Sequence, residues 1–311
     1  MYNTTKPYKK EIIELIKKTQ ETNYVLIKND VVMKNFSCGE FHHTDGMGTK
    51  GIYHWNQRSF KNAVIDAMAM NLNDLAMARA VPYAVIDHLF LPKDDKEAIL
   101  EIVNYLAEEC QKRSIAITGG ETAIHDNMEG LEISIAMLGF VKNPKPNLFK
   151  VGDVLVGIES NGLHSNGFTK VREIFGKKYK QEFIAPTAIY SDAIFNLNEK
   201  VDIHGMMHIT GGAFTKLKDL LIGADAIIND SHKLEPQEIF LELYKKGGIS
   251  DKEIYQTFNC GIGFVLGVDK NEADKCINEM GNFKADIIGE VIDGKGNVKI
   301  LSKFSNKKIK Y

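Results

Sequence analysis

The spacing of apolar positions predicts alternating helices and strands along all 311 residues. Apolar side chains recur every three or four residues where we expect helices, and form short runs or strict alternations where we expect strands. The predicted helices cover residues 9–20, 59–72, 95–110, 166–175, 189–198, 212–221, 236–244 and 270–280. The predicted strands cover residues 24–27, 31–33, 82–91, 115–118, 131–138, 154–158, 224–228, 264–268, 285–292 and 297–301. This pattern indicates a mixed α/β fold.

Smaller signals refine these elements. A turn at Asn29-Asp30 joins the first two predicted strands, and Asp94 is expected to cap the helix that follows it. The segment Lys142–Asn147 is rich in proline and polar residues, and the chain is longer than one hydrophobic core usually supports. We therefore expect two domains, residues 1–145 and 146–311.

Composition excludes several classes of protein. The net charge of −2 lacks the basic surplus of a nucleic-acid or anionic-membrane binder, and the basic end Lys307–Lys310 is expected to be solvated. The start of the chain is too polar for a signal peptide, and no apolar run is long enough to span a membrane. The four cysteines are far apart and form no Cys-x-x-Cys motif, which fits a cytoplasmic, reducing compartment. They are Cys38, Cys110, Cys260 and Cys276.

A glycine-spaced segment, Thr44–Lys50, is the first candidate for chemistry. Backbone N–H groups of such a loop can hold phosphate, Lys50 can add a positive charge, and Asp45 can bind a metal. It is not a Walker loop, because the spacing differs. An ordinary turn is the alternative.

Two further acids in the first half occupy unusual positions. Asp74 follows an apolar helix, where its charge opposes the negative end of the helix dipole. Glu121 follows Gly119-Gly120, which we expect to turn tightly at the end of a strand. Together with Asp45, these acids suggest magnesium bound to nucleotide phosphates, although solvated surface acids are the alternative.

In the second half, the stretch Ser160–Phe168 joins a predicted strand to a helix and contains His164. Free backbone N–H groups at such a turn can bind an anion, next to a side chain that titrates near neutral pH. A similar histidine-glycine turn is His208–Gly212, and Thr257–Gly263 opens an apolar strand, where tight packing is the preferred explanation of the glycines. The residues alone indicate a two-domain α/β enzyme that handles phosphate.

Six motifs occur in the order found in aminoimidazole ribonucleotide synthetase, also called phosphoribosylformylglycinamidine cyclo-ligase, and the chain resembles this family from about residue 40 almost to its end. Each motif is weak alone, but six in one order are specific. They are Asp45–Lys50, Asn73–Leu75, Gly119–Ala123, Gly162–Gly167, His208–Gly212 and Thr257–Gly263.

The resemblance implies a homodimer whose N-terminal sheets form a barrel-like core. Each chain would also have a C-terminal α/β domain containing a mixed sheet. It implies ATP-dependent ring closure of formylglycinamidine ribonucleotide to aminoimidazole ribonucleotide in purine biosynthesis. ATP would phosphorylate the amide oxygen of the substrate, and a substrate nitrogen would then displace phosphate. Magnesium is an implied cofactor, and K⁺ is a further candidate.

The resemblance also implies roles for particular residues. His164, Asp74 and Lys50 would act in catalysis, and Asp45, Asp74 and Glu121 would bind magnesium. Contacts to ATP would come from Asp45, Gly46, Gly48, Thr49, Lys50, Asn73, Gly119 and Gly120. Contacts to the substrate would come from Ser160, His164, Ser165, Asn166, Thr210, Gly211 and Gly212.

The chain departs from the family pattern in three places. Lys34–Glu40 replaces a glycine-rich loop, Ile124–Asn127 replaces a Met-Pro-Gly turn, and Arg79 stands where glycine is usual. The first two changes bear on the ATP-covering segment and on substrate contacts.

Two other functions stay open: a sibling ATP-using enzyme such as thiamine-monophosphate kinase or selenophosphate synthetase, and a nucleotide-binding paralogue without catalysis.

Overall fold

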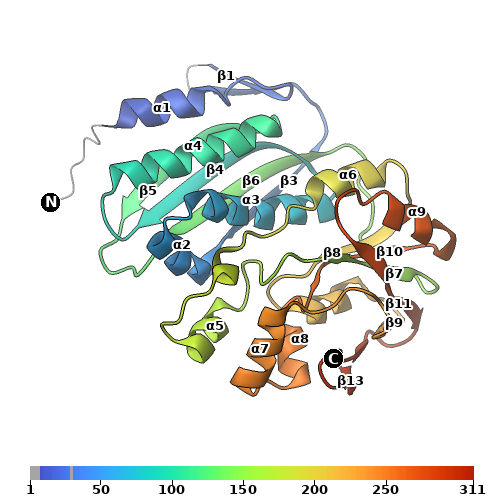
Figure 1. Ribbon diagram of the computed structural model, residues 1–311. Helices are drawn as coiled ribbons and strands as arrows, with labels where there is room; N and C mark the ends of the chain where they lie inside the picture. Colours follow the sequence, from blue (N-terminus) through green and yellow to red (C-terminus); the bar gives the residue numbers. More distant parts are fainter. Residues whose placement is uncertain (1–7, 29–30) are drawn as a thin grey trace. The chain divides into compact units, whose positions relative to one another are not determined.

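The computed structural model describes residues 8–28 and 31–311, which form two compact units (Figure 1). The N-terminal unit ends at Asn143 but leaves out Ala76–Arg79, which belongs with Pro144–Tyr311 in the C-terminal unit. The predicted turn Asn29-Asp30 lies outside the described residues.

The N-terminal unit contains a four-stranded mixed sheet of order β3-β6-β4-β5, in which only the β4–β5 pair is parallel. Its strands are β3 (Gly39–Gly46), β4 (Val81–Leu91), β5 (Ala116–Ile124) and β6 (Glu132–Val141). A separate hairpin consists of β1 (Val25–Lys28) and β2 (Val31–Lys34). The helices are α1 (Lys9–Lys17), 3-10 helix η1 (Gly48–Lys50), α2 (Gly51–Gln57), α3 (Phe60–Met77) and α4 (Lys96–Lys112).

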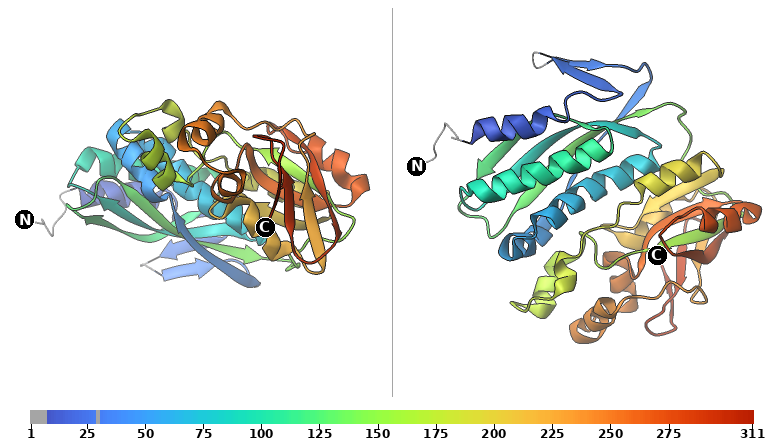
Figure 2. Two further views of the ribbon diagram at one scale, coloured as in Figure 1. Left: turned by 90° about the horizontal axis from the view of Figure 1, so that it is seen from below. Right: turned by 45° about the horizontal axis from the view of Figure 1, so that its top comes forward.

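The two faces of this sheet differ in what covers them. Helices α3 and α4 lie over one face (Figure 2), and the alternating residues Ile133, Ile135 and Met137 of β6 are fully buried there. The opposite face carries Ile86, which is 47% exposed, and the stacked rings of His88 and Phe90. The alternation predicted for residues 131–138 is therefore confirmed, and it separates a buried face from an exposed one.

The structure corrects three local expectations in this unit. Asp95, not Asp94, caps α4, because its side chain accepts a hydrogen bond from the N–H of Ala98 at 3.1 Å. Helix α3 continues to Met77, so Asp74 lies within its last turn instead of after it. Gly119 and Gly120 make no tight turn, because β5 continues through both and pairs with β4.

The segment Lys34–Glu40, which departs from the family pattern, is anchored by aromatic packing. The ring of Phe36 lies 4.8 Å from that of Tyr83 and 4.7 Å from that of Phe140. The Glu40 carboxylate accepts a hydrogen bond from the Tyr83 hydroxyl at 2.9 Å. Apolar rings thus hold this segment against the sheet in place of a glycine-rich loop.

The C-terminal unit contains a seven-stranded mixed sheet of order β13-β12-β9-β11-β7-β10-β8. Its strands are β7 (Val154–Glu159), β8 (Ile203–His208), β9 (Ala224–Ile228), β10 (Ile262–Val268), β11 (Ala285–Asp293), β12 (Val298–Leu301) and β13 (Lys308–Lys310). The α-helices are α5 (Phe168–Phe175), α6 (Ser191–Asn198), α7 (Glu238–Gly247), α8 (Asp251–Thr257) and α9 (Ala273–Asn278). The 3-10 helices are η2 (Gln181–Ile184), η3 (Ala213–Leu220) and η4 (Lys270–Glu272). The predicted mixed α/β class is confirmed.

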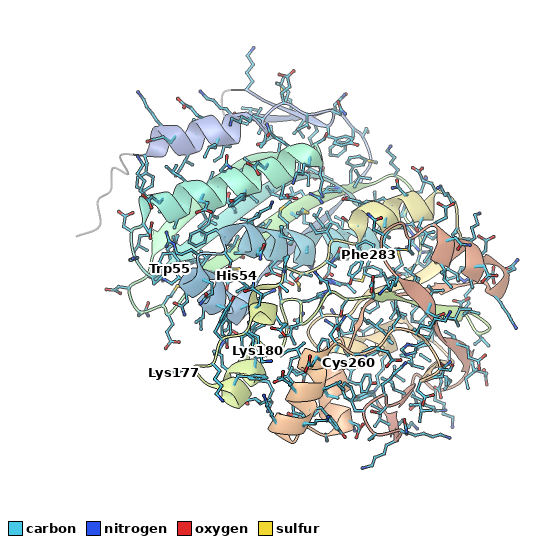
Figure 3. All side chains as sticks on the ribbon, viewed as in Figure 1. His54, Trp55, Lys177, Lys180, Cys260 and Phe283 are labelled. Atoms are coloured by element: carbon cyan, nitrogen blue, oxygen red, sulfur yellow. The ribbon has the colours of Figure 1, made fainter. Side chains whose placement is uncertain are left out.

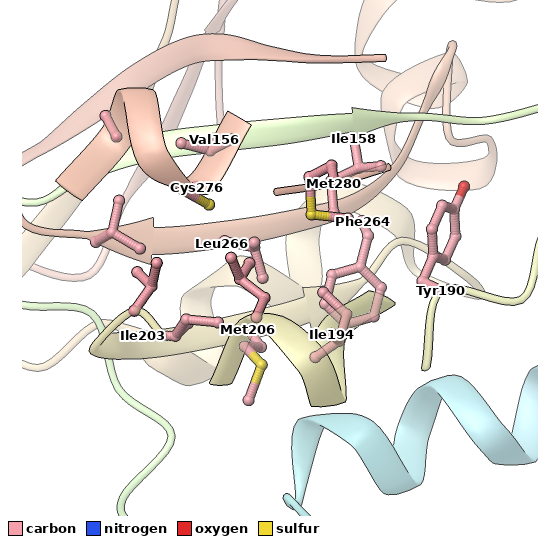
Figure 4. Close-up of a cluster of buried hydrophobic side chains, with 14 of the residues drawn as sticks. Val156, Ile158, Tyr190, Ile194, Ile203, Met206, Phe264, Leu266, Cys276 and Met280 are labelled. Atoms are coloured by element: carbon pink, nitrogen blue, oxygen red, sulfur yellow. The ribbon is translucent and has the colours of Figure 1, made fainter. Parts of the chain in front are cut away.

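A cluster of buried side chains joins α6 and α9 to the central strands β7, β10 and β8 (Figure 4). Phe264 and Leu266 of β10 and Met206 of β8 are fully buried within it. Cys276 also belongs to this core, where burial raises the pKa of its thiol to about 12. The central strands are apolar because helices cover them, so their sequence shows continuous runs instead of alternation.

Three expectations for this unit need correction. His208 ends strand β8, which the sequence analysis did not predict, and α8 was missed as well. Residues 213–220 form a 3-10 helix instead of an α-helix. The lysines of the basic end are exposed, as expected, although Lys308–Lys310 also pairs with β12.

Arg79, where the family usually has glycine, adopts a left-handed backbone conformation with φ of 54°. Glycine is the residue that enters this region without steric cost. The Arg79 guanidinium donates a hydrogen bond at 2.8 Å to the carbonyl oxygen of Ile203. The side chain thus supplies a contact that glycine would lack, in exchange for a less favourable backbone conformation.

Candidate active site

The end of β3 is tied to helix α3 through one buried amide. Asn71 of α3 donates a hydrogen bond to the backbone oxygen of Asp45 at 3.1 Å, and its side-chain oxygen lies 3.0 Å from Nδ1 of His43. The carboxylate of Asp45 accepts a hydrogen bond from the N–H of Gly46 at 2.7 Å. Asp45 is therefore held at the edge of the sheet by local contacts.

Asp74 of helix α3 is paired with His43 of strand β3, the strand that also carries Asp45. Its carboxylate lies 3.2 Å from Nε2 of His43, and both side chains are largely buried. The hydrogen bond with Asp74 is the main reason that the pKa of His43 is raised, against the opposing effect of burial. The neighbouring His43, whose pKa is raised, explains why an acid is tolerated near the negative end of the helix dipole.

A second carboxylate beside Asp45 was missed from the sequence. Glu132, the first residue of β6, accepts a hydrogen bond from the N–H of Gly48 at 3.3 Å. Burial raises the pKa of Glu132 to about 7, and the Asp45 charge adds to this effect. A Cβ on Gly46 would lie 2.9 Å from the backbone oxygen of Ile133 and 2.4 Å from Glu132 Oε1, so the close approach of the backbone favours glycine there. The alternation starting at Leu131 indicated only a strand, so the sequence analysis did not identify Glu132 as a candidate site residue.

The glycine pair of β5 makes room for a buried acid of β4. A Cβ on Gly120 would lie 2.4 Å from Oδ1 of Asp87, its partner across the strands. Burial raises the pKa of Asp87 to about 7, and the charge of Glu121 contributes. Both carboxyl groups line a cavity of about 290 Å³ that α1 borders through Ile12 and Ile16. The signal for Asp87 was an acid within an otherwise apolar strand.

The structure does not bring Asp45, Asp74 and Glu121 together within one chain. Asp45 is on β3 and Glu121 on β5, which are three strand spacings, or about 14 Å, apart. The register also places them on opposite faces, since Asp45 aligns with Ile135 and Asp87, whereas Glu121 aligns with His88. The sheet of a single chain therefore does not assemble these three acids into one magnesium site.

The predicted contact of Lys50 with phosphate is contradicted by its burial. The Lys50 ammonium is fully buried, 2.7 Å from Oδ2 of Asp66, and the same oxygen lies 2.8 Å from Nε2 of His54. His54 is labelled on α2 in Figure 3. Burial alone would raise the pKa of Asp66, but the Lys50 charge and the His54 hydrogen bond hold it well below its usual range. A spacing pattern could not reveal this partner, because Asp66 lies on another helix.

The neighbouring residues of that segment remain accessible. Gly48 and Thr49 are exposed, and Gly48 has a positive φ of 58° that suits glycine. Asn73 is fully buried in α3, so its side chain offers no open surface to a nucleotide. The accessible part of the predicted phosphate loop is therefore the backbone around Gly48-Thr49.

In the C-terminal unit, the loop containing His164 is held by buried hydrogen bonds. Asn259 donates one to the carbonyl oxygen of Gly162 at 2.8 Å and accepts one from the Ser160 hydroxyl at 2.8 Å. Asn259 also accepts from the N–H of Gly261 at 3.0 Å. The segment Thr257–Gly263 therefore does more than pack tightly, because its Asn259 holds the His164 loop through these hydrogen bonds.

His164 is buried rather than exposed, and its backbone φ is 58°, which is uncommon outside glycine. Its ring centroid lies 6.1 Å from that of Tyr190 and 6.4 Å from that of His208. Gly263 permits this approach, because an added Cβ would lie 2.7 Å from Cε1 of His164. The two predicted histidine turns are therefore brought together. Strain held by surrounding contacts is typical of functional positions.

The remaining predicted substrate residues gather at the same loops. The Ser165 and Thr187 hydroxyls are 2.9 Å apart, and a Cβ on Gly211 would lie 3.4 Å from Oδ1 of Asn166. Lys216, missed from the sequence, donates a hydrogen bond to the Thr210 hydroxyl at 3.1 Å. Gly212, with φ of 80°, directly precedes η3. Small polar groups and one lysine thus form a surface suited to an anionic ligand.

The fold and these loops define a two-domain α/β protein with acids in one unit and a histidine loop in the other. Residues 31–141 match the AIR synthase related protein N-terminal domain, and residues 150–301 match its C-terminal domain. The chain therefore belongs to the AIR synthase related family, as the motifs predicted.

Individual relatives agree with this membership. The chain is 33% identical to the phosphoribosylformylglycinamidine cyclo-ligase of Methanococcus vannielii over 286 residues, 86% of this chain and 80% of the relative. It is 35% identical to the enzyme of that name from Methanocaldococcus jannaschii over 272 residues, 80% and 77% of the two chains.

Solved structures of two other proteins share the fold. The hydrogenase maturation protein HypE in complex with ATP matches with a TM-score of 0.74 at 14% identity, covering 99% of this chain and 95% of HypE. Thiamine-monophosphate kinase from Stenotrophomonas maltophilia matches with a TM-score of 0.69 at 16% identity, covering 93% and 95%. In the described part of the chain, no helix has the length and apolar character needed to cross a bilayer.

Proposed function

We propose that this protein closes the imidazole ring of aminoimidazole ribonucleotide from formylglycinamidine ribonucleotide, using ATP. The observation that carries the proposal is the 33% identity over 86% of the chain to a relative named for this reaction. The structural siblings agree in fold at 14–16% identity and do not separate the activities. The sequence relatives therefore favour ring closure over the kinase alternative.

Phosphorylation of the amide oxygen by ATP makes that oxygen a good leaving group. A substrate nitrogen then attacks the same carbon, the carbon–oxygen bond breaks, and phosphate leaves as the ring closes. His164 is the residue we assign to proton transfer at the reacting amide, since imidazole titrates near neutral pH and its ring is fixed by packing. Ser165, Asn166 and the turn Thr210–Gly212 would orient the phosphorylated sugar, with Lys216 as a further positive group.

For ATP, the exposed backbone around Gly48-Thr49 is the proposed phosphate contact. The buried ion pair of Lys50 with Asp66 would keep that segment in place, which is a positioning role. Asp45, Glu132 and Asp74 offer hard oxygen ligands near the end of β3, and this donor set fits Mg²⁺, with K⁺ as a weaker candidate. Bound magnesium would neutralise charge on the transferred phosphate.

Within one chain the backbone of Glu121 lies about 14 Å from that of Asp45 and alternates to the other face, so in this proposal Glu121 joins these acids from a second copy of the chain. The same face exposes Ile86, which a partner sheet would cover. We therefore include a homodimer in the proposal, with the N-terminal sheets face to face in a barrel-like core. Residues 1–145 would bind ATP and dimerise, and residues 146–311 would close over the substrate. A cytoplasmic location fits such a metabolic enzyme.

The test measures phosphate released from ATP with and without formylglycinamidine ribonucleotide, together with the imidazole product. We expect release that depends on this substrate and matches the product one to one. Transfer of phosphate to thiamine monophosphate, with no ring closure, would instead establish the kinase alternative. ATP binding with neither reaction would establish a non-catalytic paralogue.

A further inference from the structure

A buried histidine and several carboxylates converge at one end of the central strands of the C-terminal sheet. Asp153 directly precedes β7, Asp269 directly follows β10, and His204 is the second residue of β8. Strand β10 pairs with both β7 and β8, with Val268 opposite Val154 and opposite Ile203. The topology therefore places residues from three distant parts of the chain at one edge.

His204 is oriented by an acid that is itself buried. Its Nδ1 lies 2.7 Å from Oδ1 of Asp153, and Oδ2 of Asp153 accepts a hydrogen bond from the N–H of Lys150 at 2.8 Å. The exposed fractions of His204 and Asp153 are 3% and 1%. An ionised carboxylate only accepts hydrogen bonds, so Nδ1 donates to Asp153 and Nε2 is the ring nitrogen left for another partner.

Nε2 of His204 is buried and, within residues 8–28 and 31–311, makes no hydrogen bond. It faces the carboxylates of Asp202 and Asp269, whose Oδ2 atoms lie at 3.5 Å and 4.0 Å. A proton on Nε2 would therefore lack a good acceptor, since a hydrogen bond of this type is usually 2.7–3.2 Å long. Leaving such a group buried without a partner is costly.

Each of these two distances suits a pair of ligands on one metal ion. Zinc binds imidazole nitrogen and carboxylate oxygen at about 2.0–2.2 Å, so two ligands at tetrahedral angles are about 3.4 Å apart. The separations of 3.5 Å and 4.0 Å are close to this value. Asp202 and Asp269 have side chains that are 57% and 63% exposed, which gives an ion a path from solvent. Lys145 contacts the other oxygen of Asp202 and would keep that carboxylate in place.

We propose that His204, Asp202 and Asp269 form a binding site for a divalent transition-metal ion, with zinc as the best fit. Water would complete the coordination on the exposed side. Asp153 acts as the carboxylate that orients the ligating imidazole, an arrangement common behind metal-bound histidines. The imidazole ligand favours Zn²⁺ over Mg²⁺, which prefers oxygen. Such an ion would link the ends of β7, β8 and β10, and this site does not depend on the proposed ring closure.

Calorimetry with the full chain, freed of metal by a chelator, tests the site. We expect the Asp202→Asn/Asp269→Asn double variant to bind one Zn²⁺ fewer per chain, or to bind it at least tenfold more weakly, with little change for Mg²⁺. The matched control is Asp274→Asn, an exposed acid of α9 outside the cluster, which should leave zinc binding unchanged. Both acids of the double variant are exposed, so folding should survive. Zinc binding equal to that of the unmodified chain would overturn the proposal.

A second measurement addresses His204 directly. In protein with ¹⁵N-labelled histidine, Zn²⁺ should shift the Nε2 resonance of His204, assigned by its loss in His204→Gln, and Mg²⁺ should not. The double variant should lose this response while its His204 signal remains. A His204 resonance that ignores stoichiometric Zn²⁺ would show that the imidazole is no ligand.

Discussion

The two units hold their reactive side chains in different ways. In the N-terminal unit, Asp45 and Glu121 stand on opposite faces of a sheet, and one of these faces is open. In the C-terminal unit, the loop of His164 is closed by contacts from the same unit, above all those of Asn259. One unit therefore presents acids on both faces of its sheet, whereas the other presents a loop that is already organised.

This difference matches the work proposed for each unit. Binding a nucleotide with its cation requires exposed oxygen ligands, and their mutual repulsion is tolerated until the cation arrives. Positioning a reacting amide requires a fixed proton carrier, and fixation comes from packing and buried hydrogen bonds. Five tests, one of them with two substitutions, probe the comparison from the largest expected effect to the smallest.

Ile86→Lys tests whether the open N-terminal face needs a second copy. A lysine at the centre of an apolar interface would lose its hydration, so we expect the dimer to dissociate at micromolar concentration and activity to be lost. Sedimentation measures the change. The control is Ile222→Lys in the C-terminal unit, where the native side chain is 75% exposed. An active Ile86→Lys dimer would contradict the proposed interface.

Asp66→Asn tests the fully buried charge cluster of Lys50, Asp66 and His54 in the N-terminal unit. Removing this carboxylate leaves the buried Lys50 ammonium uncompensated, which should lower the free energy of unfolding by about 3–5 kcal/mol. Denaturant unfolding measures this loss. Glu11→Gln, which removes an exposed ion pair with Lys96, should shift the midpoint very little. Similar small shifts in both variants would mean that Lys50 is not held as described.

His164→Asn tests the closed loop of the C-terminal unit. Asparagine tolerates the positive φ, so the fold and nucleotide binding should persist while turnover falls roughly a hundredfold or more. Steady-state kinetics with formylglycinamidine ribonucleotide measure the change. His208→Asn removes the same volume from the neighbouring buried ring and controls for packing. Equal losses in the two variants would indicate a packing role for His164.

Asp74→Asn and Glu121→Gln test two acids of the N-terminal unit while keeping side-chain shape. Each removes a hard anionic ligand, so Mg-ATP should bind about tenfold more weakly by calorimetry. Asp74→Asn should also lower the pKa of His43, because Asp74 is what raises it; histidine NMR would record this. Glu129→Gln, an exposed acid near Glu121 in sequence, is the control. Unchanged affinity in both variants would return these acids to ordinary surface roles.

Asp87→Asn tests the buried carboxyl of the N-terminal cavity. Its pKa rises from an ordinary 3.8 to about 7 on folding, so folding favours the protonated form. Below pH 4 both states are protonated and no stability is lost; between pH 4 and 7 the unfolded state ionises first, and stability falls as pH rises. Asparagine removes this penalty, so it should gain about 2–3 kcal/mol over aspartate at pH 8 relative to pH 5. Thermal unfolding of the unmodified protein and the variant at pH 5 and pH 8 measures this gain. A stability difference that is the same at both pH values would contradict the raised pKa of Asp87.

The order and type of most elements could be predicted from the sequence. Continuous apolar runs marked the buried strands, such as residues 264–268, and alternation marked β6. Local rules of this kind succeed because helices and strands repeat with different periods. They failed at Gly119-Gly120, where glycine was interpreted as a turn. Those glycines lie in a strand, and at Gly120 the close neighbour is Asp87, a residue far away in sequence.

The sequence by itself determined the family and which residue types the site contains, because short motifs such as Gly162–Gly167 keep their order along the chain. The tertiary structure alone decided how those residues are used. Burial next to Asp66 removed Lys50 from the phosphate contacts, and pairing across the sheet separated Asp45 from Glu121 while placing Glu132 beside Asp45. Charge, burial and distance between residues far apart in sequence depend on strand register and helix packing, which no local pattern records.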